Sequence, residues 1–155
     1  MALTEPGTPV GRSKAGQAGT RQFSMRVSKP IFDDLERRAR ETAEARNALA
    51  ERYIAEGVRM DEHPGIYFRE GALGRRAALI GTRLDVWQMI QTLRNHENSL
   101  EQTAGYLGVT VSRVRAAVRY YVAYQDEIDA VAEREMEAAL RAEAAWRAEQ
   151  ELLAG

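Results

Sequence analysis

The chain of 155 residues contains no cysteine. It can therefore form neither a disulfide framework nor a thiolate metal site, and a reducing cytoplasmic setting is the natural expectation. No stretch approaches the roughly 18 uninterrupted apolar residues of a membrane span, and the first residues lack the apolar core of a signal peptide. We expect a soluble, cytoplasmic protein that does not associate with a membrane.

The usual motifs of enzymes are also missing. His63 and His96 are isolated from each other, and the chain has no HExxH motif, no phosphate-binding glycine loop and no nucleophile elbow. Adjacent acids such as Asp33 and Asp34 point in different directions on a helix and serve poorly as cooperating carboxylates. We expect no catalytic activity, no metal and no cofactor.

The net charge of -1 hides an asymmetry along the chain. Residues 1–60 carry +3, residues 61–125 carry +2, and residues 126–155 carry -6. A basic front and an acidic rear suit a protein that meets a polyanion at one end and a basic partner at the other. The alternative is that the rear is simply a solvated acidic helix.

Residues 1–20 are rich in Gly, Pro, Ser, Thr and Ala and have few large apolar side chains. Such a segment cannot offset the entropy lost on ordering, so we expect a disordered arm. Its basic residues, Arg12 and Lys14, serve either a passive tail or contacts with DNA phosphates.

The segment RQFSMRVS, residues 21–28, alternates strictly between apolar and polar side chains. This period predicts a short strand with one buried face. Ser28 and Pro30 then suit a helix start, with Asp33 and Asp34 in the first turn, and the helix is expected to end near Ala43. A second helix is expected from about Asn47, which would cap it, to about residue 61.

A single strand before two helices leaves both of its edges open and buries little surface. The economical solution is pairing with the same strand of a second copy. We therefore expect at least a homodimer, in which a two-stranded antiparallel ribbon rests on four helices.

This order of elements resembles the ribbon-helix-helix repressors of the Arc, MetJ and CopG type over residues 21–60, on the basis of RQFSMRVS, the SKP junction and LERRA. In that family the ribbon lies in the major groove of double-stranded DNA. The resemblance implies base contacts by Gln22, Ser24 and Arg26, with Arg21 at the entry, and phosphate contacts by the backbone amides of Asn47 and Ala48. Many family members have a glycine between the two helices, whereas TAEARN has none, so a longer or continuous helix is an alternative there. Plain dimerisation without DNA reading is the alternative function.

Residues 61–125 have a different character. HPGIYFREG and RRAALIGTR predict a hairpin, and a helix with Asp85 near its start follows. SLEQ predicts a capping box in which the Ser99 and Gln102 side chains both take part, and Gly108 suits a tight turn before VSRVRAAVRYYVAYQDEI.

Two helices joined by a short turn with a glycine form a helix-turn-helix outline. The second helix carries Arg113, Arg115 and Arg119 as candidate DNA contacts, while Tyr120 and Tyr124 would add phosphate hydrogen bonds. The alternative is a structural helix with solvated arginines.

Residues 63–128 resemble a domain family of unknown function found in VapB-type antitoxins. The likeness is carried by HPGIYFREG, IGTR, SLEQTAGYLGVT and VRAAVRYYVAYQDEI. This resemblance implies an antitoxin or regulator whose partner is a PIN-like nuclease toxin.

Residues 126–155 consist mainly of Ala, Glu and Arg and predict a long helix. Its sparse apolar residues include Leu140 and Trp146, which we expect to form a partner-binding face. A plain surface helix is the alternative.

Together these patterns predict a mainly α protein with a ribbon-helix-helix unit at residues 21–60, a hairpin and helix-turn-helix module at 61–125, and an acidic helix at 126–155. The expected function is that of a sequence-specific transcriptional repressor, the antitoxin of a toxin-antitoxin pair. The alternative is a non-catalytic adaptor that dimerises through its ribbon and binds partners through its last helix.

Overall fold

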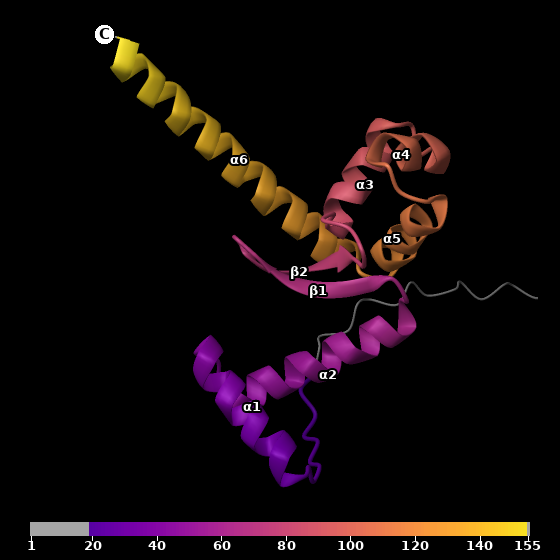
Figure 1. Ribbon diagram of the computed structural model, residues 1–155, viewed down its shortest axis with the longest axis vertical. Coiled ribbons are helices and arrows are strands. Elements are labelled where there is room, and N and C mark those ends of the chain that lie inside the picture. The colour runs from indigo at the N-terminus through magenta and orange to yellow at the C-terminus, as the bar shows by residue number, and fades with distance from the viewer. Residues whose placement is uncertain (1–18, 155) are drawn as a thin grey trace, which may run out of the picture.

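The computed structural model describes residues 19–154, so nearly all of the arm expected at residues 1–20 lies outside the described residues. The described part is mainly helical, with one small antiparallel hairpin, and from residue 29 onward its elements follow the order that the sequence predicts (Figure 1). The elements are α1 (Lys29–Thr42), α2 (Arg46–Glu62), β1 (Ile66–Gly71), β2 (Gly74–Leu79), α3 (Val86–Asn95), α4 (Leu100–Leu107), α5 (Val111–Ala123) and α6 (Gln125–Ala154). None of the helices in residues 19–154 is both long and apolar enough to cross a membrane.

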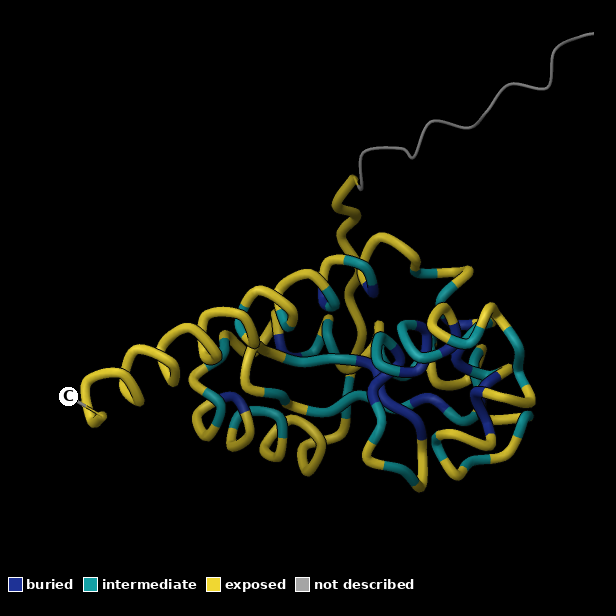
Figure 2. Tube along the Cα trace, turned by 90° about the horizontal axis from the view of Figure 1, so that it is seen from above, coloured by how far each residue is buried: buried dark blue, intermediate teal, exposed yellow. Residues whose placement is uncertain are grey.

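The hydrophobic core belongs to the hairpin and the helices that follow it. The two strands pair from Ile66 opposite Leu79 to Gly71 opposite Gly74, where the chain turns. The buried cluster joins the hairpin to α3, α4, α5 and the first turn of α6, and includes Ile66, Leu79, Val86, Met89, Ile90, Val114, Ala117, Tyr120 and Ile128. Figure 2 shows these buried segments gathered in one half of the molecule.

By contrast, α1 and α2 have almost no core of their own. The only side chains that they bury are Ala39 and Leu49. Figure 1 shows the two helices on the side of the hairpin that faces away from α6. The rest of their apolar stripe stays open.

The start of α1 agrees with the sequence in position but not in detail. Ser28 is the residue before the helix, and Pro30 lies in the first turn. The Ser28 side chain makes no capping hydrogen bond, and the first turn contains no acid, because the helix begins at Lys29 and places Asp33 and Asp34 one turn further on. Asp33 pairs instead with Lys29, at 2.6 Å.

The turn between α1 and α2 exists although it has no glycine. Ala43 takes the left-handed conformation, with φ of 53°, and its neighbour Glu44 donates its amide hydrogen bond to the Ala39 carbonyl. A continuous helix, the alternative left open by TAEARN, is therefore wrong. The expected cap at Asn47 is also wrong by two residues, because Ala45 precedes a helix that begins at Arg46.

The helix-turn-helix outline is confirmed in the second module. Ser99 Oγ accepts the Gln102 amide at 3.3 Å, and Gly108 ends α4 in the left-handed conformation with φ of 65°. The second bond of a capping box, from the N-cap backbone amide to a side chain three residues later, is found at α3 and not at α4. There the Gln88 side chain accepts a hydrogen bond from the backbone amide of Asp85 at 2.9 Å. The helix expected to run from residue 111 to 128 is interrupted at Tyr124, so that α6 begins at Gln125.

Candidate nucleic-acid interface

The N-terminal segment, residues 19–28, has no regular secondary structure in the single chain. Arg21, Gln22, Ser24 and Arg26 are exposed, as expected of DNA contacts. Two side chains that the sequence places on the buried face of the strand are also exposed to solvent: Phe23 is 75% exposed and Met25 is 59% exposed. Because the ribbon requires a second copy of the chain, it stays a prediction.

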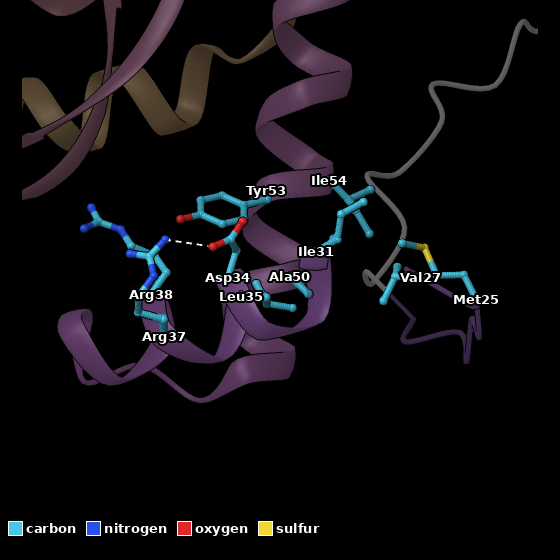
Figure 3. Close-up of a pocket in the computed structure, with 10 residues that line it drawn as sticks. All are labelled: Met25, Val27, Ile31, Asp34, Leu35, Arg37, Arg38, Ala50, Tyr53 and Ile54. Atoms are coloured by element: carbon cyan, nitrogen blue, oxygen red, sulfur yellow. Dashed lines mark hydrogen bonds and ion pairs between the residues drawn. The ribbon is translucent and has the colours of Figure 1, made fainter. Parts of the chain in front are cut away.

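An apolar groove of about 470 Å³ lies where this segment meets α1 and α2. Figure 3 shows Ile31 of α1 beside Ile54 of α2, with Met25 and Val27 of the N-terminal segment next to them. Leu35, Ala50 and Tyr53 complete its apolar lining. The groove thus collects the open apolar stripes of both helices and the predicted inner face of the strand.

The basic residues fall into two groups, those that form salt bridges within the chain and those that do not. Most Lys and Arg side chains among residues 19–154 form salt bridges with acids of the same chain. Within that range the basic side chains that form none are Arg21, Arg26, Arg40, Arg83, Arg113, Arg115, Arg119 and Arg134. All five arginines that the sequence predicts as DNA contacts are in this group.

Asn47 and Ala48 are exposed in the first turn of α2. The first backbone bond into this helix runs from the Leu49 amide to the Ala45 carbonyl at 2.9 Å. The amides before Leu49 therefore have no partner within the helix, and Ala45 offers no side-chain cap. This is the geometry that the predicted phosphate contact requires.

The three arginines of α5 do not form one surface. Arg115 and Arg119 are one turn apart and share the exposed face of the helix, whereas Arg113 lies on roughly the opposite side. The Arg113 guanidinium approaches the backbone at Gly81, in the loop between β2 and α3. Sequence reasoning missed Ser112 and Ala116, which extend the Arg115 and Arg119 face and have its helical spacing of three, four and seven residues.

The expected phosphate contact by Tyr120 is wrong, whereas that by Tyr124 stays a prediction. Tyr120 is fully buried, and its hydroxyl accepts a hydrogen bond from Arg59 Nη1 at 3.1 Å. Tyr124 is half-buried, with the Arg59 guanidinium 4.2 Å above its ring centre. Both tyrosines therefore hold α2 against α5 and α6.

The histidines also have structural surroundings. The His63 ring packs edge-on against Tyr120, with 5.2 Å between ring centres, and His96 Nδ1 lies 2.9 Å from the Thr92 carbonyl oxygen. Residues 19–154 contain no cluster of three or more His, Asp or Glu side chains arranged to hold a metal ion.

The distal half of α6 touches no other element, and all its side chains from residue 139 to 154 are exposed (Figure 2). Leu140 is 66% exposed and Trp146 is 60% exposed. They do not share one face as expected: Trp146 follows the buried Ile128 by five full turns, while Leu140 lies about a third of a turn away. Trp146 and Leu153 instead continue the stripe that α6 buries at Ile128, where the helix packs mainly on α3.

Comparisons with protein-family models, with curated proteins and with solved structures found no match to this chain. The assignment of a function therefore depends on the geometry described above.

Proposed function

We propose that the protein is a homodimeric, sequence-specific regulator that binds double-stranded DNA through a ribbon formed by residues 21–28 of two copies. The observation that carries this proposal is the open apolar groove of the N-terminal unit. As the repressor of its own operon, such a dimer would fit the antitoxin role that the sequence resemblances imply.

Incomplete burial of the N-terminal unit supports a second copy. The N-terminal segment, α1 and α2 bury only Ala39 and Leu49 among residues 19–62, so they leave most of their apolar surface in water. Ile31, Ile54 and Val58 are each about half exposed, although they lie on the inner stripes of α1 and α2. A second copy brings a matching strand and matching stripes, so it would cover both grooves at once in a closed two-fold assembly.

The other face of the same segment supports DNA as the ligand. Once Met25 and Val27 turn inward, Gln22, Ser24 and Arg26 point outward, and residues 19–28 contain no acid. Arginine can pair with guanine through two hydrogen bonds, and glutamine can do so with adenine. Paired across a two-fold axis, these residues would read a palindrome.

The test selects a binding site from a pool of random duplexes and then measures affinity by fluorescence anisotropy at several salt concentrations. We expect a palindromic site, an affinity that falls steeply with salt, and a loss of about tenfold or more for that site in Arg26→Gln. Arg141→Gln removes an equal charge from the distal part of α6 and is the matched control. Equal effects of the two substitutions, or selection of no preferred sequence, would contradict the proposal.

The exposed end of α6 favours a second role, binding of a partner protein. Trp146 and Leu153 continue a stripe that is buried nearer the hairpin, and the acids around them suit a basic surface. A PIN-like nuclease toxin with a basic groove is the partner that the sequence resemblance suggests. Without DNA binding, the same two features would make the protein a dimeric adaptor.

This role is tested by co-purification with a PIN-like nuclease encoded beside the gene. Deletion must begin after residue 138, because Ile128 and Val131 belong to the buried part of the fold. We expect the truncated chain and Trp146→Ala to lose the partner, and Arg141→Gln to retain it. Retention by the truncated chain would exclude α6 as the binding element.

A further inference from the structure

The exposed face of α5 forms a second basic surface, far along the chain from the predicted ribbon. Ser112, Arg115, Ala116 and Arg119 follow one another at helical spacing, and α5 contains no acid. Neither Arg115 nor Arg119 has a carboxylate partner within the described part of the chain. We call these four residues the α5 stripe.

The α5 stripe places two arginines without a salt bridge one turn apart. Other exposed arginines, such as Arg37 on α1 and Arg147 on α6, pair with acids one turn away on their own helices, although Arg40, Arg83 and Arg134 form no salt bridge among the described residues either. Arg115 and Arg119 sit on a helix that offers no such acid, with small side chains between them. A helix face with small side chains beside two guanidinium groups that form no salt bridge among the described residues complements the phosphates of nucleic acid.

Two sets of side chains hold α2 against the rest of the fold, one at α5 and the start of α6 and the other at β2. Arg59 of α2 contacts Glu127 Oε2 at 2.8 Å and the Tyr120 hydroxyl at 3.1 Å, and it stacks on Tyr124. Glu56 of α2 forms a two-point contact with Arg75 of β2, where Nη2 lies 2.7 Å from Oε2. Because α2 also lines the N-terminal groove, this single helix runs from the groove to the contacts that Arg59 makes with α5. Figure 1 shows α2 extending from α1 toward the hairpin.

We propose that each protomer holds one DNA duplex at two places, through the predicted ribbon and through the α5 stripe, with α2 as the rigid connection between them. We take the duplex contacted by the stripe to be the one read by the ribbon, since two linked sites that engage one duplex together bind it more tightly than either site alone. This inference rests on the proposed DNA-binding function and adds a phosphate-binding surface to it.

The experiment measures how the affinity of the full chain for a mixed-sequence 60-base-pair duplex depends on salt. Each lost phosphate contact lowers the slope of log affinity against log salt by about 0.9, so Arg115→Gln with Arg119→Gln should lower it by about 3 to 4 per dimer. The matched control is Arg141→Gln with Arg147→Gln, which removes the same charge from exposed positions on α6. Lysine at positions 115 and 119 should retain most of the slope, because the charge remains.

The possible results separate the two claims. A slope unchanged beyond the control would overturn the α5 stripe even if Arg21→Gln with Arg26→Gln weakens binding, which leaves the ribbon intact. A fall for the stripe without any effect at Arg21 and Arg26 would overturn the ribbon instead. Absence of salt-dependent binding by the unmodified chain would overturn both, and two duplexes bound per dimer would show that the stripe holds a different duplex.

Discussion

At the scale of single residues, Tyr120 links the stability of the protein to alkaline pH. It is fully buried, and burial, followed by the nearby charge of Glu127, raises the pKa of its hydroxyl to about 12. A pKa raised in the folded state means that the stabilisation is complete below the ordinary value near 10 and is lost as the pH rises from about 10 to 12.

We predict that the free energy of unfolding falls by about 2 kcal/mol over this range, after allowance for screening by nearby solvent. Urea unfolding at a series of pH values measures it. Tyr120→Phe should flatten the fall, whereas Tyr106→Phe, at a position 73% exposed, should leave it unchanged. The same fall in both variants would show that Tyr120 is not its source.

Asp85 is the second residue with a marked effect on stability. Its fully buried carboxylate lies between two arginines, 2.7 Å from Arg69 Nε through Oδ1 and 2.6 Å from Arg76 Nε through Oδ2. The contact with Arg76 is an ion pair in which the two atoms are not aligned for a hydrogen bond. Asp85 therefore stabilises Arg76 through its negative charge.

We predict that Asp85→Ala destabilises the fold by about 3 kcal/mol, because it leaves two partly buried cations without their common partner. Asp33→Ala, which removes an exposed partner of Lys29, should cost less than about 1 kcal/mol. Thermal or urea unfolding gives both values. A similar small loss at both positions would mean that water replaces the Asp85 carboxylate.

At the scale of elements, α1 and α4 both end at a residue in the left-handed conformation, and opposite substitutions at these two residues test its cost. Ala43 holds a positive φ at the end of α1, whereas Gly108 holds one at the end of α4 with open space where a Cβ would lie. The left-handed conformation costs a residue with a Cβ roughly 1 to 2 kcal/mol, part of which glycine loses again through the entropy of the unfolded chain.

We predict that Ala43→Gly stabilises the protein by about 0.5 to 1 kcal/mol and that Gly108→Ala destabilises it by about 1 kcal/mol. Both follow from equilibrium unfolding of the single variants. If glycine at position 43 lowers stability, as glycine does inside a helix, then the left-handed conformation of Ala43 does not strain the protein.

The element scale also shows what a sequence can and cannot predict. The hairpin, the start of α3 at Asp85 and the turn at Gly108 were predictable, because local patterns and turn chemistry determine them. The position of the α1 to α2 turn was predicted as well, although the left-handed conformation of Ala43 and the helix start after Ala45 were not. The break at Tyr124 was not predicted, because tyrosine is an ordinary helix residue by propensity. Tertiary contacts, such as Arg59 stacking on Tyr124, override that propensity.

Candidate site residues follow the same rule. The exposed arginines could be named from sequence, and their spacing also predicts that Arg115 and Arg119 share a face of the helix while Arg113 does not. The approach of Arg113 to the backbone at Gly81 was not predictable, because that loop lies more than 30 residues away along the chain. The burial of Tyr120 was not predictable, because its partner Arg59 is 61 residues away along the chain. A tyrosine in a basic helix looks the same in sequence whether it faces solvent or the core.

At the scale of the whole molecule, one part of the described chain has a buried hydrophobic core and the other part leaves its apolar side chains exposed. The hairpin and α3 to α5 enclose a core, whereas α1, α2 and the N-terminal segment present a groove with matching apolar stripes on both sides. A fold of this kind reaches full stability only when its open part is covered, so we expect stability to depend on protein concentration.

Sedimentation equilibrium of the full chain tests this most directly. The single chain has a mass of 17.4 kDa, and we predict twice that mass at micromolar concentration, with Ile54→Asp shifting the equilibrium toward the single chain. Leu152→Asp, an equal change at an exposed apolar position of α6, should leave the double mass unchanged. A mass of 17.4 kDa at every concentration would contradict the account, because the groove would then have no second copy to fill it.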